Sequence, residues 1–174
     1  MNNSLIEQYA HNIINHKKYL MQKEFIQHGD ISVYDHEINV TKMCINISKK
    51  LNIKVNYRSL IRGSLLHDYF LYDWHIKDSS HRLHGFRHAK ISMNNADRDF
   101  HLNKVEKNMI YCHMFPLNIR IPRYKESIIL CVADKICAIK ETIEYRSVSI
   151  SKLYYYYIHR NLENKILYKL LINQ

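Results

Sequence analysis

Asp134 is a carboxylate inside the most apolar run of the chain, residues 128–139. A charge in such a run is expected to be buried, and burial is costly unless the charge is paired or binds a metal ion. Histidine is the commonest metal-binding side chain. The chain supplies candidate partners upstream of Asp134: His36, the dipeptide His67-Asp68, His88 and His113. Together these residues predict a metal-dependent enzyme.

The dipeptide His67-Asp68 follows an apolar run, residues 60–66. Neighbouring residues on a helix point about 100° apart. Both side chains can therefore serve one site only if that site lies near the helix end, or if the carboxylate bridges. A lone His-Asp pair is a weak signal for a metal site. A structural histidine at a helix C-terminus followed by an exposed aspartate would give the same sequence pattern. His36 on a separate helix and the buried Asp134 strengthen the metal interpretation.

The order of these residues resembles the metal-binding signature of the HD-domain superfamily of metal-dependent phosphohydrolases, over roughly residues 30–145. That signature is carried here by His36, His67-Asp68 and Asp134. Four stretches also look like one bacterial subgroup of uncharacterised HD proteins: 66–74, 83–89, 113–117 and 133–138. The resemblance implies an all-α, single-domain helical bundle of HD type.

The resemblance also implies a role for individual residues. Four of them match the ligands of the family's first metal: His36, His67, Asp68 and Asp134. In relatives with two metals the aspartate of the His-Asp pair bridges, and His88 and His113 match the histidines that hold the second ion. His84 competes with His88 for this place. The subgroup tends to have His-Pro where this chain has His88-Ala89, which is a mild departure.

Mixed imidazole and carboxylate ligands suit Fe, Mn, Co or Ni better than a cysteine-rich zinc site would, and Mg is a further candidate. The sequence does not choose between one ion and two. A divalent ion lowers the pKa of a bound water and orients it for attack on phosphorus. We therefore expect a phosphohydrolase that acts on a phosphomonoester, nucleotide or cyclic nucleotide. Asp68 would bind metal and help to align the nucleophile.

Residues close to the ligands in sequence extend the expected site. Four cations are candidates for holding the substrate phosphate, with ordinary surface charge as the simpler explanation of each: Arg87, Lys90, Arg123 and Lys135. The loop 73–88 carries groups that could gate the site or give a proton to the leaving group. Asp73 and His84 are the catalytic candidates there, whereas His75 and His81 fit a solvated loop better.

The net charge of +10, from 26 basic and 16 acidic residues, suggests an anionic partner such as a phosphate ester or nucleotide, although the charge is spread along the chain. The alternative function is a non-catalytic, metal-stabilised module that senses a nucleotide or holds a protein partner. The complete ligand set argues against it. No motif supports direct binding to nucleic acid. The tyrosine run 154–157 favours core contact and a helix–helix or homodimer interface over stacking on bases.

The elements that must position these residues are expected to be helices, because the chain is 47% apolar with three glycines and two prolines. One domain spans residues 1–174, with the motif core at about 30–145. No segment shows strand alternation. Helices are expected at 4–27, 33–51, after Asn56, 88–101, 104–115, 124–145 and about 149–172. The first and last of these are expected to pack on the core.

The chain shows no sign of a membrane or export signal. It has no apolar run of 18 residues, and its N-terminus lacks the pattern of a signal peptide. The four cysteines form no CxxC pair: Cys44, Cys112, Cys131 and Cys137. Reduced core cysteines in a cytoplasmic protein account for them best.

Overall fold

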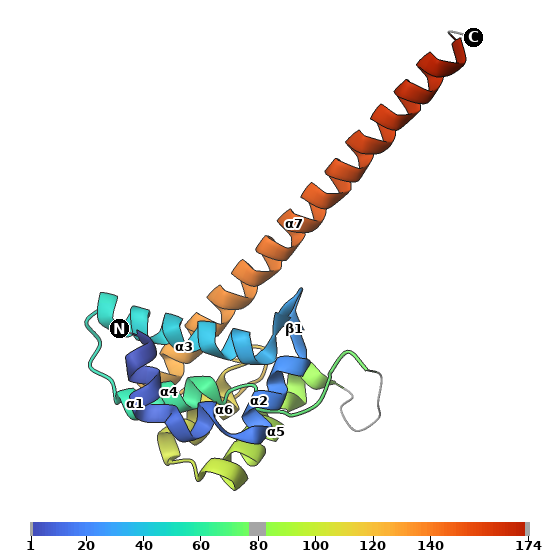
Figure 1. The fold of residues 1–174 in the computed structure, drawn as a ribbon. Coiled ribbons are helices and arrows are strands. Elements are labelled where there is room, and N and C mark those ends of the chain that lie inside the picture. Colours follow the sequence, from blue (N-terminus) through green and yellow to red (C-terminus); the bar gives the residue numbers. More distant parts are fainter. Residues whose placement is uncertain (1, 77–82, 173–174) are drawn as a thin grey trace.

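A computed structural model shows a body of packed helices from which the last helix projects (Figure 1). It describes residues 2–76 and 83–172, with side chains up to residue 151. Seven α-helices lie in these residues: α1 (Asn2–Ile14), α2 (Lys17–Leu20), α3 (Val33–Lys50), α4 (Tyr57–Leu65), α5 (His84–Phe100), α6 (Lys104–Cys112) and α7 (Lys125–Ile172). A short 3₁₀ helix η1 (Met21–Glu24) and two antiparallel strands, β1 (Ile26–His28) and β2 (Ile31–Ser32), complete the described part. The chain is mostly helical and forms one domain, as the sequence predicts.

Helix α4 lies at the centre of the core. Every residue from 59 to 70 is buried, and α4 packs against α1, α3, α6 and α7. One apolar cluster lies between α4 and α1 and includes Ile13, Ile61 and Leu65. A second lies toward α6 and α7 and includes Met109 and Leu130. The turn after α4 is therefore held in the interior, where its polar residues have to find partners.

Side-chain caps start three of the helices that carry the site, namely α3, α4 and α6. The Ser32 hydroxyl accepts the Asp35 N–H at 3.1 Å, so α3 begins at Val33 as predicted. The Asn56 side chain accepts the Ser59 N–H at 3.1 Å and caps α4, again as predicted. A capping box between Asn103 and Glu106 starts α6. Each cap satisfies N–H groups that the first helical turn leaves unpaired.

The N-terminal region differs from the single helix predicted for 4–27. The helix ends at Ile14, and α2, η1 and a small hairpin of β1 and β2 follow. These strands are two and three residues long, too short for a sequence alternation to reveal them. Gly29 makes the hairpin turn at φ +60°, a conformation that glycine adopts without strain.

Three further boundaries differ. Helix α6 ends at Cys112, three residues before the predicted end at 115. Helix α5 begins at His84, four residues before the predicted start, so His84 is helical and not part of a loop. The sequence predicts separate helices over 124–145 and 149–172, the second packed on the core. The structure instead has one helix, α7, whose C-terminal half leaves the body in Figure 1. No glycine or proline interrupts it, and the Ser147 and Ser151 hydroxyls donate to carbonyls within the same helix.

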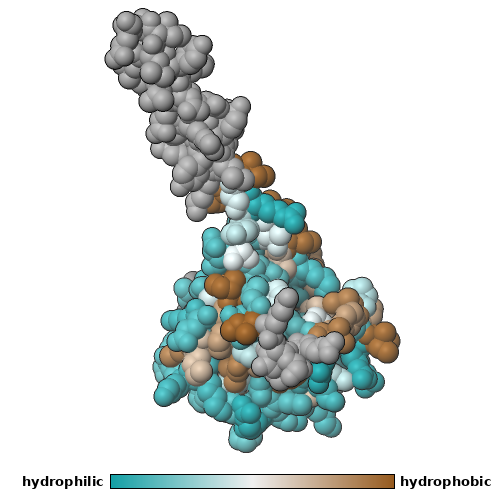
Figure 2. All heavy atoms as spheres, turned by 90° about the vertical axis from the view of Figure 1, so that its right-hand side faces the viewer, coloured by the Kyte–Doolittle hydropathy of each residue, from teal (hydrophilic) through white to brown (hydrophobic). Residues whose placement is uncertain are grey.

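The surface is mostly hydrophilic on the face in Figure 2, with hydrophobic side chains on α7 where it leaves the body. Four exposed residues of α7 belong to this stretch: Ile139, Ile143, Val148 and Ile150. None of the helices in the described residues combines the length and apolar character needed to cross a membrane.

Candidate metal centre

Five segments bring six polar side chains to one place inside the body. The residues are His36 on α3, His67 and Asp68 in the turn after α4, His88 on α5, His113 directly after α6, and Asp134 on α7. All six are at most 8% exposed. The structure thus gathers every residue that the sequence marks as a metal ligand. His67 and Asp68 can share the site because they lie where the helix has ended.

One group of side chains surrounds an oxygen of Asp134. Its Oδ1 lies 3.2 Å from Nε2 of His36 and 3.6 Å from Nε2 of His67. Asp68 Oδ2 approaches the same two nitrogens, at 4.0 Å for His36 and 3.4 Å for His67. The donor atoms of His36, His67 and Asp134 are close enough together to hold one metal ion.

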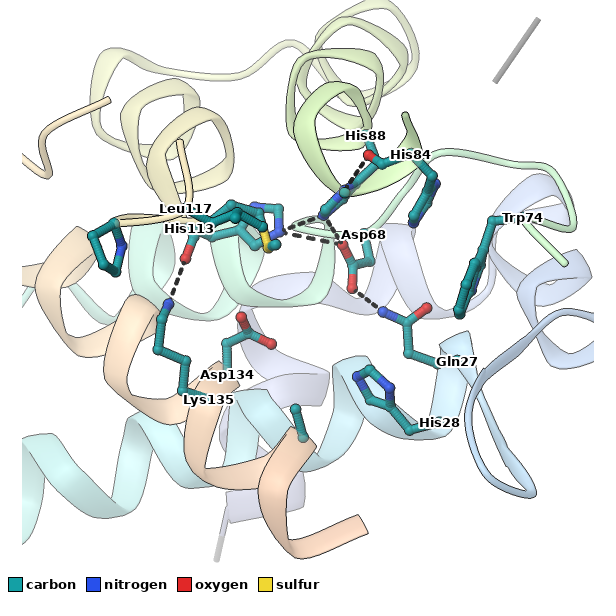
Figure 3. Close-up of a pocket in the computed structure, with 14 residues that line it drawn as sticks. Gln27, His28, Asp68, Trp74, His84, His88, His113, Leu117, Asp134 and Lys135 are labelled. Atoms are coloured by element: carbon teal, nitrogen blue, oxygen red, sulfur yellow. Dashed lines mark hydrogen bonds and ion pairs between the residues drawn. The ribbon is translucent and has the colours of Figure 1, made fainter. Parts of the chain in front are cut away.

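A second group surrounds the other oxygen of Asp68. Its Oδ1 lies 3.3 Å from Nε2 of His88 and 3.4 Å from Nε2 of His113. The two nitrogens are 2.9 Å apart. Figure 3 shows Asp68 pointing between these rings and the lower part of the cavity, where Asp134 lies. Asp68 therefore belongs to both groups and presents one oxygen to each.

Main-chain carbonyls orient three of the rings. The Nδ1 atoms lie 2.7–2.9 Å from a carbonyl oxygen in each case: His67 on Ser64, His88 on His84, and His113 on Ile110. A carbonyl can only accept, so each Nδ1 carries the hydrogen and each Nε2 is directed into the site. Such fixed outer contacts are typical of metal-binding histidines.

Two buried atoms in this centre lack a hydrogen bond within the part of the chain that the structure describes. They are Nε2 of His67 and Oδ1 of Asp68. Buried polar atoms are nearly always satisfied, so such a pair calls for a partner. The lone pair of His67 Nε2 and the carboxylate oxygen Oδ1 of Asp68 are both acceptors, and a cation bound to both atoms would satisfy them.

The electrostatics of the centre favour positive charge. Burial lowers the pKa of His36, but Asp134 and Glu141 outweigh it and raise that pKa to about 10. Burial likewise opposes protonation of His67, whereas the charge of Asp68 raises its pKa to about 9. For Asp68 burial acts in the opposite direction, yet the histidines hold the pKa of its carboxyl well below its usual range. Sites that attract protons this strongly also attract metal ions, which compete for the same lone pairs.

Glu141 is a part of the centre that the sequence does not single out. It is seven residues after Asp134, so both side chains lie on one face of α7. Its carboxylate accepts Nδ1–H of His36 at 2.8 Å and the Asn39 amide at 3.1 Å. The seven-residue spacing from Asp134 in an apolar segment is the signal that could have identified Glu141.

The hairpin supplies two more residues for which the sequence has no signal. The Gln27 amide donates to Asp68 Oδ2 at 2.6 Å. His28 lies beside His36, with ring centroids 5.2 Å apart, and could form a third cluster with His36 and Glu141. Since Nδ1 of His36 donates to Glu141, this cluster orients the ring of His36.

A cavity of 680 Å³ opens beside the centre (Figure 3). Its polar lining includes Asp68, His84, His88, His113 and Asp134. Its apolar lining consists of Trp74, Met114, Pro116, Leu117 and Ala138. A volume in this range suits a small-molecule ligand.

The four cations predicted to hold phosphate are not gathered at this cavity. Lys135 lines it, and its ammonium donates to the carbonyls of His113 and Cys131 at 3.1 and 3.2 Å. Arg87 and Lys90 line a separate depression of 450 Å³ on the outer face of α5. Arg123 is exposed on the loop before α7 and lines neither space.

The two predicted catalytic residues of the 73–88 segment also differ in position. His84 lines the cavity, stacks on His88 with ring centroids 4.5 Å apart, and is hydrogen-bonded through Nδ1 to the Tyr72 hydroxyl at 2.9 Å. Asp73 does not line the cavity; its carboxylate accepts the His75 N–H at 2.9 Å. His88, not His84, faces Asp68 and His113. His81 lies outside the described residues.

No family model, no curated protein and no solved structure matches this chain. What the structure itself establishes is a helical protein with buried histidine and aspartate clusters that could hold metal ions.

Proposed function

We propose that this protein is a metal-dependent phosphohydrolase of the HD type. The observation that carries the proposal is the position of Asp68, whose two oxygens face two different groups of histidines. A carboxylate shared in this way can hold two ions close together. Paired ions of this kind stabilise both the attacking and the leaving oxygen of an in-line displacement at phosphorus.

The donor atoms fit a divalent transition-metal ion, because they are imidazole nitrogens and carboxylate oxygens without a thiolate. His36, His67 and Asp134 would hold one ion together with Asp68, and His88 and His113 would hold the other with the second oxygen of Asp68. When bound, such ions lower the pKa of a coordinated water and neutralise charge on the phosphoryl oxygens.

The residues of the chain supply position and proton transfer. Glu141 and the main-chain carbonyls hold the imidazoles in place before substrate arrives, which lowers the reorganisation needed during the reaction. Asp68 contacts both groups of histidines and so holds one group in a defined position relative to the other. His84 lines the cavity next to His88, and an imidazole there can give a proton to the leaving oxygen.

Hydrolysis of p-nitrophenyl phosphate with added Mn²⁺, Co²⁺ or Ni²⁺ tests the proposal. Asp68→Ala is expected to lose activity by at least about 100-fold while its circular dichroism stays that of a folded protein. Glu144→Ala is the control, because it removes a carboxylate from α7 that is exposed. Full activity in folded Asp68→Ala would refute the assignment. Tight metal binding with no hydrolysis of any phosphoester would favour the non-catalytic module.

A further inference from the structure

Lysine and arginine side chains are scarce among the described residues that line the cavity beside the candidate metal centre. Among the described lining residues Lys135 is the one lysine or arginine, and its ammonium already donates to two main-chain carbonyls. Arg87 and Lys90 lie outside, on another face of α5. A chain of phosphates would therefore find few cations along the described walls.

The metal centre itself can balance one phosphoryl group. With two divalent ions, the carboxylates of Asp68 and Asp134 leave a net charge of about +2, and Glu141 behind His36 lowers the total to about +1. A phosphomonoester carries a charge of about −1.5 to −2 at neutral pH. This limited positive charge favours a single phosphoryl group, whereas a triphosphate would bring negative charge that the described walls do not offset.

The remaining walls are suited to an apolar group. Figure 3 shows Trp74 and His84 on one side of the cavity and Leu117 and Lys135 on the other. Met114, Pro116 and Ala138 also line it. Nε1 of Trp74 is buried and has no hydrogen-bond partner in the described residues. Aromatic and aliphatic walls with few polar groups are typical of sites for flat organic ligands.

We propose that the substrate is a phosphomonoester with one phosphoryl group and a flat apolar leaving group that packs between Trp74 and Leu117. The inference rests on the proposed function and narrows its substrate class. Water adds to phosphorus, and the bond between phosphorus and the ester oxygen breaks. The ester oxygen keeps the bonding electrons and takes up a proton, so the products are an alcohol and inorganic phosphate.

The kinetic test compares benzyl phosphate with ethyl phosphate, because both release a primary alcohol and differ mainly in the apolar group. In the wild type, kcat/KM for benzyl phosphate is expected to exceed kcat/KM for ethyl phosphate by about tenfold or more, because the cavity buries the phenyl ring. In Trp74→Ala the two kcat/KM values should be nearly equal, and in Trp74→Phe most of the preference for benzyl phosphate should return. Phe86→Ala is the matched control, since Phe86 is an exposed aromatic that lines the other depression, and its preference for benzyl phosphate should not change.

A binding test does not depend on turnover. Trp74 is the only tryptophan in the chain, so intrinsic tryptophan fluorescence reports on this wall alone. Benzylphosphonate, which is not hydrolysed, should change the emission and bind about tenfold more tightly than ethylphosphonate. Equal affinities, or no change in emission, would overturn the inference. A preference for pyrophosphate or ATP over benzyl phosphate would also overturn it. If neither ester is hydrolysed but benzylphosphonate binds as expected, the proposed function fails and the apolar pocket stands.

Discussion

The Nε2 atoms of His88 and His113 lie 2.9 Å apart, although each ring donates its Nδ1–H to a main-chain carbonyl. Two neutral rings held in this way would direct lone pairs at each other. A cation between or beside them removes that repulsion. The contact therefore marks the second group as a place for positive charge, and it distinguishes His88 from its neighbour His84.

The number of bound metal ions should depend on His88 and His113 but not on His84. The wild type is expected to retain about two ions per chain after loading with Mn²⁺ and desalting, whereas His113→Gln and His88→Gln should retain about one. His84→Gln should keep both, because His84 stacks on His88 but does not face Asp68. Elemental analysis measures the content, with His101→Gln as an exposed control. Loss of metal in His84→Gln but not in His88→Gln would reverse the assignment.

Glu141 should affect metal affinity through the orientation of His36. Glu141→Ala removes the acceptor for Nδ1–H of His36 and is expected to weaken Mn²⁺ binding by about 10–100-fold. Glu141→Gln keeps an acceptor oxygen and should recover part of the loss. Isothermal titration calorimetry measures the affinity, and Glu144→Gln on the exposed face of α7 serves as the control. Equal affinities in all of these variants would show that the contact has no role.

Metal binding should stabilise the fold, because the ligands come from five separate segments. At 100 times the dissociation constant the free energy of unfolding should rise by about 2.7 kcal/mol. For a chain of this size that corresponds to a rise in Tm of roughly 5–10 °C. Differential scanning calorimetry with and without Mn²⁺ checks this, and a chelator should reverse it. A Tm unchanged by any divalent ion would argue against a buried metal site.

Asp99 should contribute stability that disappears in acid. Arg98 and Lys18 donate to its carboxylate, and these contacts hold the pKa of Asp99 below its usual range. A lowered folded-state pKa stabilises the fold above the unfolded-state pKa of about 4, and the effect fades as the pH falls below that value. Asp99→Asn is therefore expected to lose about 1 kcal/mol at pH 7, the upper range for a pair near the surface. Urea unfolding should show this loss shrinking at pH 3, and a loss of equal size at both pH values would contradict the explanation.

Gly29 should be intolerant of a side chain. Its φ is +60°, and a Cβ would lie 2.6–2.8 Å from atoms of Tyr145 on α7. Gly29→Ala is expected to lower the free energy of unfolding by about 1–2 kcal/mol. Gly85→Ala is the contrasting variant, because among the described residues its Cβ would meet Leu117 alone, at 3.9 Å, and alanine favours a helix. Thermal unfolding of both variants measures the difference.

The sequence was sufficient for the helical class and for the set of six candidate ligands. Helix α3 and the cap at Asn56 follow from local preferences, since apolar spacing and capping involve residues a few positions apart. Asp134 stands out because a carboxylate within an apolar run requires a partner. Such signals survive without knowledge of the fold. The hairpin, the early start of α5 and the unbroken α7 could not be predicted in this way. They depend on contacts between segments or on the absence of a helix-breaking residue.

The arrangement of the centre depends on packing between distant segments. His36 and Asp134 are 98 residues apart, and only the contact between α3 and α7 sets their atoms at 3.2 Å. The same packing assigns one oxygen of Asp68 to each group. Arg87 faces away from the cavity for a local reason, because the residue before His88 on α5 points to another face of the helix. The sequence thus identified the types and the order of the candidate ligands, but the direction of each side chain follows from how the helices lie against one another.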